Sequence, residues 1–125
     1  MSRINESIPI FVKITEGIKD HILMGDLKEG EQLPSTTMIS REYNINIATV
    51  NKAVNILVSE GIAFKKRGIG MFVSEGAREK LKDKARTKLI EEHISKLVEE
   101  AKKLGIGKTE LIDIIRKDES WGEKS

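Results

Sequence analysis

The chain has 125 residues, a formal net charge of +2 and no cysteine. This length suits one ordinary domain or a small domain with an appendage, and the missing cysteines exclude a disulfide framework and thiolate chemistry. No run approaches the roughly 18 apolar residues that cross a bilayer, and the N-terminus lacks the apolar core of a secretion signal, so we expect a cytoplasmic protein without a membrane partner.

The N-terminal part predicts one amphipathic helix from Ile10 to Met24. Apolar residues recur there at steps of three and four, which is the spacing of one helix face. Pro9 suits the first turn, and Gly25 is a natural stop. A polar, glycine-marked loop follows over residues 25–32.

Two short helical patterns come next, separated by a polar break at residues 43–46. Ser35 is a good N-cap for the first helix, Asn46 can cap the second, and Gly61 ends it. Three apolar residues share one side of the first helix: Met38, Ile39 and Tyr43. Four share one side of the second: Val50, Ala53, Val54 and Leu57.

Two short apolar runs, at residues 62–64 and 71–73, predict a β-hairpin. They are joined by the basic glycine turn Lys65-Lys66-Arg67-Gly68-Ile69-Gly70. Residues 46–75 hold four Lys/Arg against two Asp/Glu, a charge of +2, whereas residues 1–45 hold five against seven, a charge of −2. Positive charge is therefore local to this part of the chain.

The composition changes after Gly76. Residues 77–104 contain no Gly or Pro and carry an apolar stripe at helical spacing, and a last helix is expected from about Lys108 to Lys117. A single helix rarely leaves so many apolar side chains in water, so we expect a dimer contact here. The expected interface residues are Leu81, Ala85, Leu89, Ile90, Ile94, Leu97, Val98, Ala101, Leu111 and Ile115.

In this order the elements have the layout of a winged helix-turn-helix. In such a domain one helix can enter the major groove of DNA, and a basic hairpin can hold the backbone beside it. The sequence therefore predicts an α+β fold. We expect residues 1–75 to form the winged helix-turn-helix domain and residues 76–125 to form a helical, two-helix dimerisation arm.

Three groups of residues are candidate contacts to double-stranded DNA. The first short helix begins with N–H groups that attract phosphate, although N-capping alone would account for its serine. The second short helix offers amide and ammonium groups that can bind adenine and guanine. The hairpin offers cations, and its glycines allow a phosphate to approach the backbone closely. In chain order the groups are Ser35, Thr36 and Thr37; Asn46, Ile47, Ala48, Thr49, Asn51 and Lys52; and Lys65, Lys66, Arg67, Gly68 and Gly70.

Plainer interpretations exist for each group. A polar helix face and a charged hairpin are often only solvated surface, and Thr49 can simply cap its helix. His21 and His93 stand without acidic or thiol sets at ligand spacing, so we expect no metal and no cofactor. No nucleophile–base arrangement or phosphate loop is present, so we expect no enzyme. Solvation is favoured over phosphate contact for six cations at the start of the long helix: Arg78, Lys80, Lys82, Lys84, Arg86 and Lys88.

Residues Pro9 to Val73 resemble the N-terminal DNA-binding domain of the GntR family of bacterial transcription regulators. The motifs that carry the resemblance are Pro9-Ile10-Phe11, Gly25-Asp26-Leu27-Lys28-Glu29-Gly30, Leu33-Pro34-Ser35, Thr49-Val50-Asn51-Lys52-Ala53, Glu60-Gly61 and Arg67-Gly68-Ile69-Gly70-Met71-Phe72-Val73. The family usually adds a large effector-binding domain. Only about 50 residues follow here, and a short two-helix part looks like that of the YtrA subfamily, where it serves as a dimerisation arm.

The chain departs from the family pattern at Thr37, Ile47 and Asn51, where the family often has arginine. Because those arginines commonly read guanine, the resemblance does not carry over the usual operator sequence. We expect a homodimeric, sequence-specific DNA-binding regulator, most simply a repressor, on a pseudo-palindromic operator. The alternative is a winged-helix adaptor that binds proteins rather than DNA. Whether a small-molecule effector binds is left open.

Overall fold

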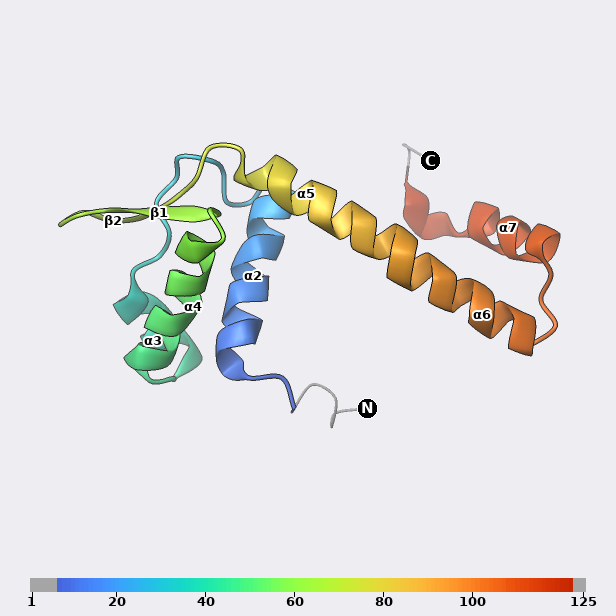
Figure 1. Cartoon of the computed structure of the whole chain (residues 1–125), viewed down its shortest axis with the longest axis horizontal. Helices are drawn as coiled ribbons and strands as arrows, with labels where there is room; N and C mark the ends of the chain where they lie inside the picture. The colour runs from blue at the N-terminus through green and yellow to red at the C-terminus, as the bar shows by residue number, and fades with distance from the viewer. Residues whose placement is uncertain (1–6, 123–125) are drawn as a thin grey trace. The chain divides into compact units, whose positions relative to one another are not determined.

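Helix α2 (Ile10–Met24) and helix α4 (Ile47–Ser59) lie side by side, and the short helix α3 (Thr36–Tyr43) packs on α4 (Figure 1). These helices belong to the first of two units into which the chain divides, between Lys84 and Ala85. The computed structural model describes residues 7–122. The predicted bounds of α2 are confirmed, and α4 ends at Ser59, where Gly61 follows with φ 75°.

The three helices pack because α4 has one apolar side. Val50, Ala53, Val54 and Leu57 are the residues of α4 that are buried, as the spacing predicts. Burying a side chain of this kind stabilises the fold by about 1.5–3 kcal/mol. Ile39 is the buried residue of α3, whereas Met38 and Tyr43 are mostly exposed, so the apolar side expected for that helix is wrong for two of its three residues.

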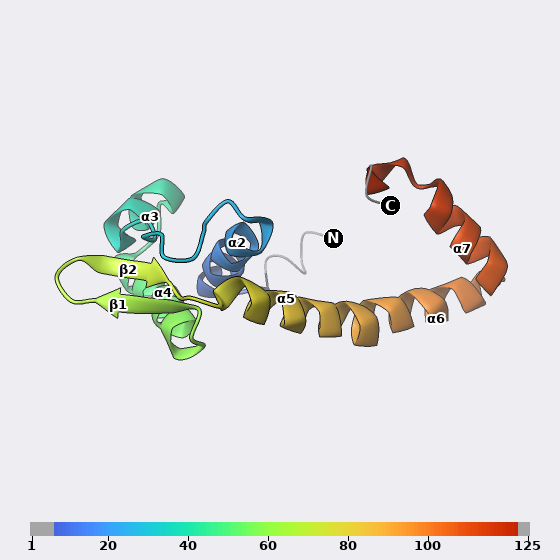
Figure 2. The ribbon, with the colours of Figure 1, turned by 90° about the horizontal axis from the view of Figure 1, so that it is seen from above.

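The hairpin consists of β1 (Ala63–Lys66) and β2 (Gly70–Val73), which pair antiparallel with Phe64 opposite Phe72. Its turn projects beyond the helices of the unit (Figure 2). The loop before α3 runs along β2: the N–H of Leu33 donates to the carbonyl of Met71 at 2.8 Å, and the N–H of Val73 donates to the carbonyl of Glu31 at 2.9 Å. The hairpin is thus tied to the unit through β2.

Helix α5 (Ala77–Lys88) begins inside the first unit. The carboxylate of Glu29 accepts the N–H groups of Gly76 and Arg78 at 2.9 and 3.2 Å, which caps the free donors of the helix start. Ala77 and Leu81 lie in the same apolar core as Leu57. Leu81, one of the predicted interface residues, is only 8% exposed and lies in the core of the first unit, which runs to Lys84.

In the second unit, α5 is followed without a break by a π-helical turn, η1 (Leu89–Ile94), and then by α6 (Ser95–Lys103). After Gly105 the chain reverses direction into α7 (Lys108–Lys117) (Figure 2). The bounds of α7 are as predicted. A last turn, η2 (Glu119–Trp121), follows, and the indole N–H of Trp121 donates to the carbonyl of Ile115 at 2.8 Å, which ties this turn to the end of α7.

The N–H and the hydroxyl of Ser120 both donate to Asp118 just after α7 and lower the pKa of that carboxyl. Within residues 7–122, no helix is both long and apolar enough to span a membrane.

Candidate nucleic-acid interface

Helix α4 presents a polar side to solvent because its apolar side is buried in the core. Asn46 caps the helix: its side-chain oxygen accepts the N–H of Ala48 at 2.8 Å. Asn44, with φ 53°, adopts the left-handed conformation that turns the chain sharply from α3 into α4. Both features follow from the polar break in the sequence.

The outward side of α4 forms an open groove of about 500 Å³. Its lining residues all come from this helix: Ala48, Asn51, Lys52, Asn55, Ile56 and Ser59. Three of the six predicted contact residues of α4 are therefore brought together, and Asn55 and Ser59 extend the polar surface by about two more turns. Ile47 is exposed beside the groove, and Thr49 is half-buried. An amide and an ammonium on one open helix face can bond base edges or phosphates.

The start of α3 holds the first predicted group. The hydroxyl of Ser35 accepts the N–H of Met38 at 3.0 Å, so this oxygen is engaged in N-capping. Thr36 is half-buried, and Thr37 is exposed in the first turn. The remaining N–H groups of that turn can still attract an anion.

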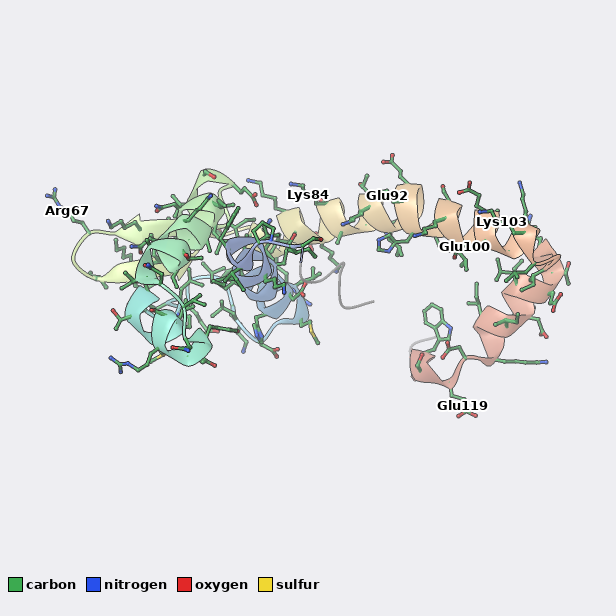
Figure 3. All side chains as sticks on the ribbon, turned by 90° about the horizontal axis from the view of Figure 1, so that it is seen from below. Arg67, Lys84, Glu92, Glu100, Lys103 and Glu119 are labelled. Atoms are coloured by element: carbon green, nitrogen blue, oxygen red, sulfur yellow. The ribbon has the colours of Figure 1, made fainter. Side chains whose placement is uncertain are left out.

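The hairpin turn holds the third group. Arg67 lies at its tip with the side chain pointing away from the unit (Figure 3). Gly68 has φ 78°, a left-handed conformation that side chains resist, and the N–H of Ile69 closes the turn on the carbonyl of Lys66 at 2.9 Å. The exposed cations Lys65 and Lys66, at the end of β1, and Arg67, in the turn, thus follow one another at the glycine-shaped end of the hairpin.

Gln32 braces this turn, and sequence reasoning did not identify it. Its amide nitrogen donates to the carbonyl of Ile69 at 3.0 Å, across 37 positions of the chain. A Cβ at Gly70, which has φ 146°, would lie 2.5 Å from the amide nitrogen of Gln32, so a side chain there would displace this amide. No local signal links these residues, because they meet only when the loop lies along β2.

Lys52 and the cations of the hairpin have no carboxylate partner within ion-pair distance among residues 7–122. Among the described residues, the lysines and arginines that pair with carboxylates do so elsewhere, for example Lys19 with Glu60 at 2.7 Å and Lys117 with Asp113 at 3.0 Å. Unpaired surface cations attract a polyanion more strongly than neutralised ones.

Two of the six cations near the start of α5 have structural partners. The guanidinium of Arg78 donates to the carbonyl of Leu23 at 3.0 Å, and the ammonium of Lys80 donates to the carbonyl of Glu60 at 3.0 Å. These bonds hold α5 on the first unit. His21 lies 3.3 Å from a carboxylate oxygen of Asp26, so it does not stand alone, but no group of three or more metal-ligating side chains occurs among residues 7–122.

The predicted interface residues of the arm divide into two classes. Ala101 is buried within the second unit, where Leu104 and Ile106 donate to its carbonyl, and Leu111 is half-buried. The others in this unit are exposed: Ala85, Leu89, Ile90, Ile94, Leu97, Val98 and Ile115.

A helix pair whose second member presents an open face with Asn51, Lys52 and Asn55, followed by a cation-tipped hairpin, defines a winged helix-turn-helix of the DNA-binding class. Residues 12–73 match the model of the gntR family of bacterial regulatory proteins. The chain belongs to the GntR family, and it is a DNA-binding transcription regulator rather than an enzyme.

Similarity extends over nearly the whole chain. The HTH-type transcriptional repressor YtrA of Bacillus subtilis is 32% identical over 122 residues, which are 95% of this chain and 93% of YtrA. A GntR family transcriptional regulator from Listeria monocytogenes has the same fold with a TM-score of 0.76 at 29% identity, covering 90% of this chain and 97% of that one. The resemblance to the YtrA subfamily is thereby confirmed.

The winged part alone is also similar to a DNA-bound domain. The structure of AraR(DBD) in complex with operator ORE1 aligns with a TM-score of 0.52 at 25% identity, covering 54% of this chain and 82% of that one.

Proposed function

We propose that this protein binds a pseudo-palindromic operator as a homodimer and represses transcription. The observation that carries the proposal is the groove of α4, which presents Asn51 and Lys52 on a helix whose opposite side is buried. In a helix-turn-helix the second helix enters the major groove, where each base pair shows a distinct pattern of donors and acceptors. The similar AraR domain is known in complex with an operator, which supports operator binding by this chain.

The three groups of contact residues have different roles in the proposal. Asn51 and Lys52 read base edges, and Ala48 lies on the same outward face of α4. Thr37 and the first turn of α3 hold one phosphate. The cations from Lys65 to Arg67 hold the backbone beside the groove, since phosphate contacts set position and affinity rather than sequence.

The homodimer is supported by the exposed apolar side chains of the arm. Leu89 and Ile90 are about half exposed, at 51% and 52%, and Leu97 and Val98 follow on the same continuous helix. Two-fold symmetry of the protein asks for two-fold symmetry of the operator. Repression is supported by the similarity to YtrA, which is a repressor. The proposal places this activity in the cytoplasm.

The test is selection from a pool of random duplexes with the purified full-length chain. We expect an inverted repeat whose half-sites are separated by about one helical turn of DNA or a multiple of it. A reporter gene placed behind the recovered repeat should be expressed less when the protein is present. Recovery of no preferred sequence would contradict the proposal and favour a winged-helix adaptor.

The adaptor alternative predicts an apolar or acidic face on α4. The described face carries the amides of Asn51 and Asn55, the ammonium of Lys52 and no carboxylate among the groove residues. This composition favours DNA over a protein partner.

A further inference from the structure

Two of the three phenylalanines of the chain lie at lysines of the candidate interface. The ammonium nitrogen of Lys52 lies 4.1 Å from the ring centroid of Phe11, and that of Lys66 lies 4.7 Å from the ring centroid of Phe72. Phe64 stacks on Phe72 with centroids 5.8 Å apart. Each lysine therefore has a cation–π contact with a ring that the sequence does not place next to it.

The rings are held more firmly than the lysines that lie over them. Phe11 is half-buried against the core around Val50 and Val54, and its carbonyl accepts the hydroxyl of Thr15 at 2.8 Å. Phe72 is half-buried in β2 opposite Phe64. A lysine side chain has many rotamers, so a fixed ring at its tip restricts where the ammonium can lie.

An aromatic ring and a carboxylate can both restrain a lysine side chain, but only the carboxylate compensates the positive charge of the ammonium group. Lys19 lies between Glu60 at 2.7 Å and Glu16 at 3.9 Å, and these carboxylates compensate its charge. An aromatic ring attracts the ammonium through its quadrupole but carries no net charge. Lys52 and Lys66 are thus restrained while their positive charge remains available to an anionic or acceptor group.

We propose that Phe11 and Phe72 are positioning residues that preorganise Lys52 and Lys66 for DNA binding. The inference rests on the proposed function, because it assumes that both lysines contact DNA. Preorganisation lowers the ordering cost that binding would otherwise carry. Loss of one ring should therefore weaken binding only through its own lysine.

A double-mutant cycle tests this coupling with the full-length chain. The probe is the duplex recovered by selection, or a mixed-sequence duplex if no preference is recovered, titrated at fixed salt. Phe11→Leu should weaken binding about two- to five-fold, the range of an exposed cation–π contact. The same change should have no further effect in a Lys52→Ala background. Phe11→Tyr, which keeps the ring, should bind like the unmodified chain.

Ile18→Val is the matched control, because Ile18 packs against the same core cluster and has no aromatic ring to offer a lysine. It should leave the affinity unchanged in both backgrounds. Thermal unfolding of each variant identifies any loss of folded protein. Phe72→Leu with Lys66→Ala repeats the cycle at the hairpin.

Three outcomes would overturn the proposal. If Phe11→Leu weakens binding equally with and without Lys52, the ring acts through the fold rather than through the lysine. If Lys52→Ala has no effect on a chain that still binds DNA, Lys52 makes no contact for Phe11 to prepare. If the unmodified chain binds neither duplex, the proposed function itself fails together with the inference.

Discussion

At the scale of single residues, Asn51 is the most direct test of base reading. It is exposed in the groove of α4, one position after the buried Val50. Asn51→Ala should cost about 1–3 kcal/mol on the selected duplex and less on mixed-sequence DNA, because an amide can bond two atoms of one adenine edge. The thermal midpoint should hardly move, since the side chain is exposed.

The measurement is a titration against the selected duplex and its single-base variants at one salt concentration. Asn55→Ala is the matched comparison: it removes the same amide one helical turn later in the same groove. It should cost less, because the N-terminal part of a recognition helix contacts base edges. Equal losses for Asn51→Ala on every duplex would make Asn51 a phosphate contact.

Gln32 supports the hairpin without being expected to touch DNA. Gln32→Met keeps the length of the side chain but removes the amide that donates to Ile69. The turn should then be less ordered before binding, and the affinity should fall on all duplexes by about 0.5–1.5 kcal/mol, the net value of one hydrogen bond. The salt slope should stay the same because no phosphate contact is removed. An unchanged affinity would show that this bond does not position the hairpin.

At the scale of elements, the hairpin is expected to contribute charge rather than sequence preference. Replacing both Lys66 and Arg67 by Ala should weaken binding to selected and mixed-sequence duplexes by similar factors, since phosphates carry no sequence information. The slope of log K against log salt should decrease by about one unit for each lost contact. An unchanged slope would mean that the hairpin does not contact the backbone. Lys13→Ala, an exposed lysine on α2, is a control that should leave the slope unchanged.

The π-helical turn η1 accounts for the spacing of the apolar stripe on the arm. Ala85, Leu89, Ile94 and Val98 follow one another at steps of four, five and four. In a π turn the hydrogen bonds join residues five apart, so Leu89 and Ile94 come to the same side of the helix. In an uninterrupted α-helix the step of five would turn the stripe away from its first half. No Gly or Pro marks the change.

At the scale of the whole molecule, the proposed dimer is expected to depend on the exposed apolar residues of the arm. Leu97→Asp should convert the dimer into a monomer, because a carboxylate in an apolar interface has no partner for its charge. The first unit should remain folded, since Leu97 lies in the second. Sedimentation at micromolar concentration measures the mass, and circular dichroism measures the fold.

Lys96→Asp is the matched control, since it places the same carboxylate on the neighbouring residue, which lies outside the apolar stripe. This variant should remain a dimer. A Leu97→Asp variant that also stayed dimeric would remove α6 from the proposed interface. Loss of the dimer should lower affinity for the full inverted repeat more than for a single half-site.

Local features of the sequence determined the elements of this protein. Pro9 and Gly25 bound α2, Asn46 caps α4, and the apolar steps of α4 identify its buried side, because caps and side-chain periods depend on residues within one or two turns. The family motifs likewise lie within short segments. These signals were sufficient for the fold class, and they are the basis of the proposed DNA interface.

The tertiary structure alone decided which side chains from distant segments meet. Leu81 continues the apolar stripe in sequence, yet it belongs to the core with Leu57. Gln32 reaches the hairpin turn and Phe11 reaches Lys52 only after α2, α4 and the loop before α3 have packed. A periodic pattern shows that a residue has an apolar neighbour but not which one, because that depends on how the elements pack in three dimensions.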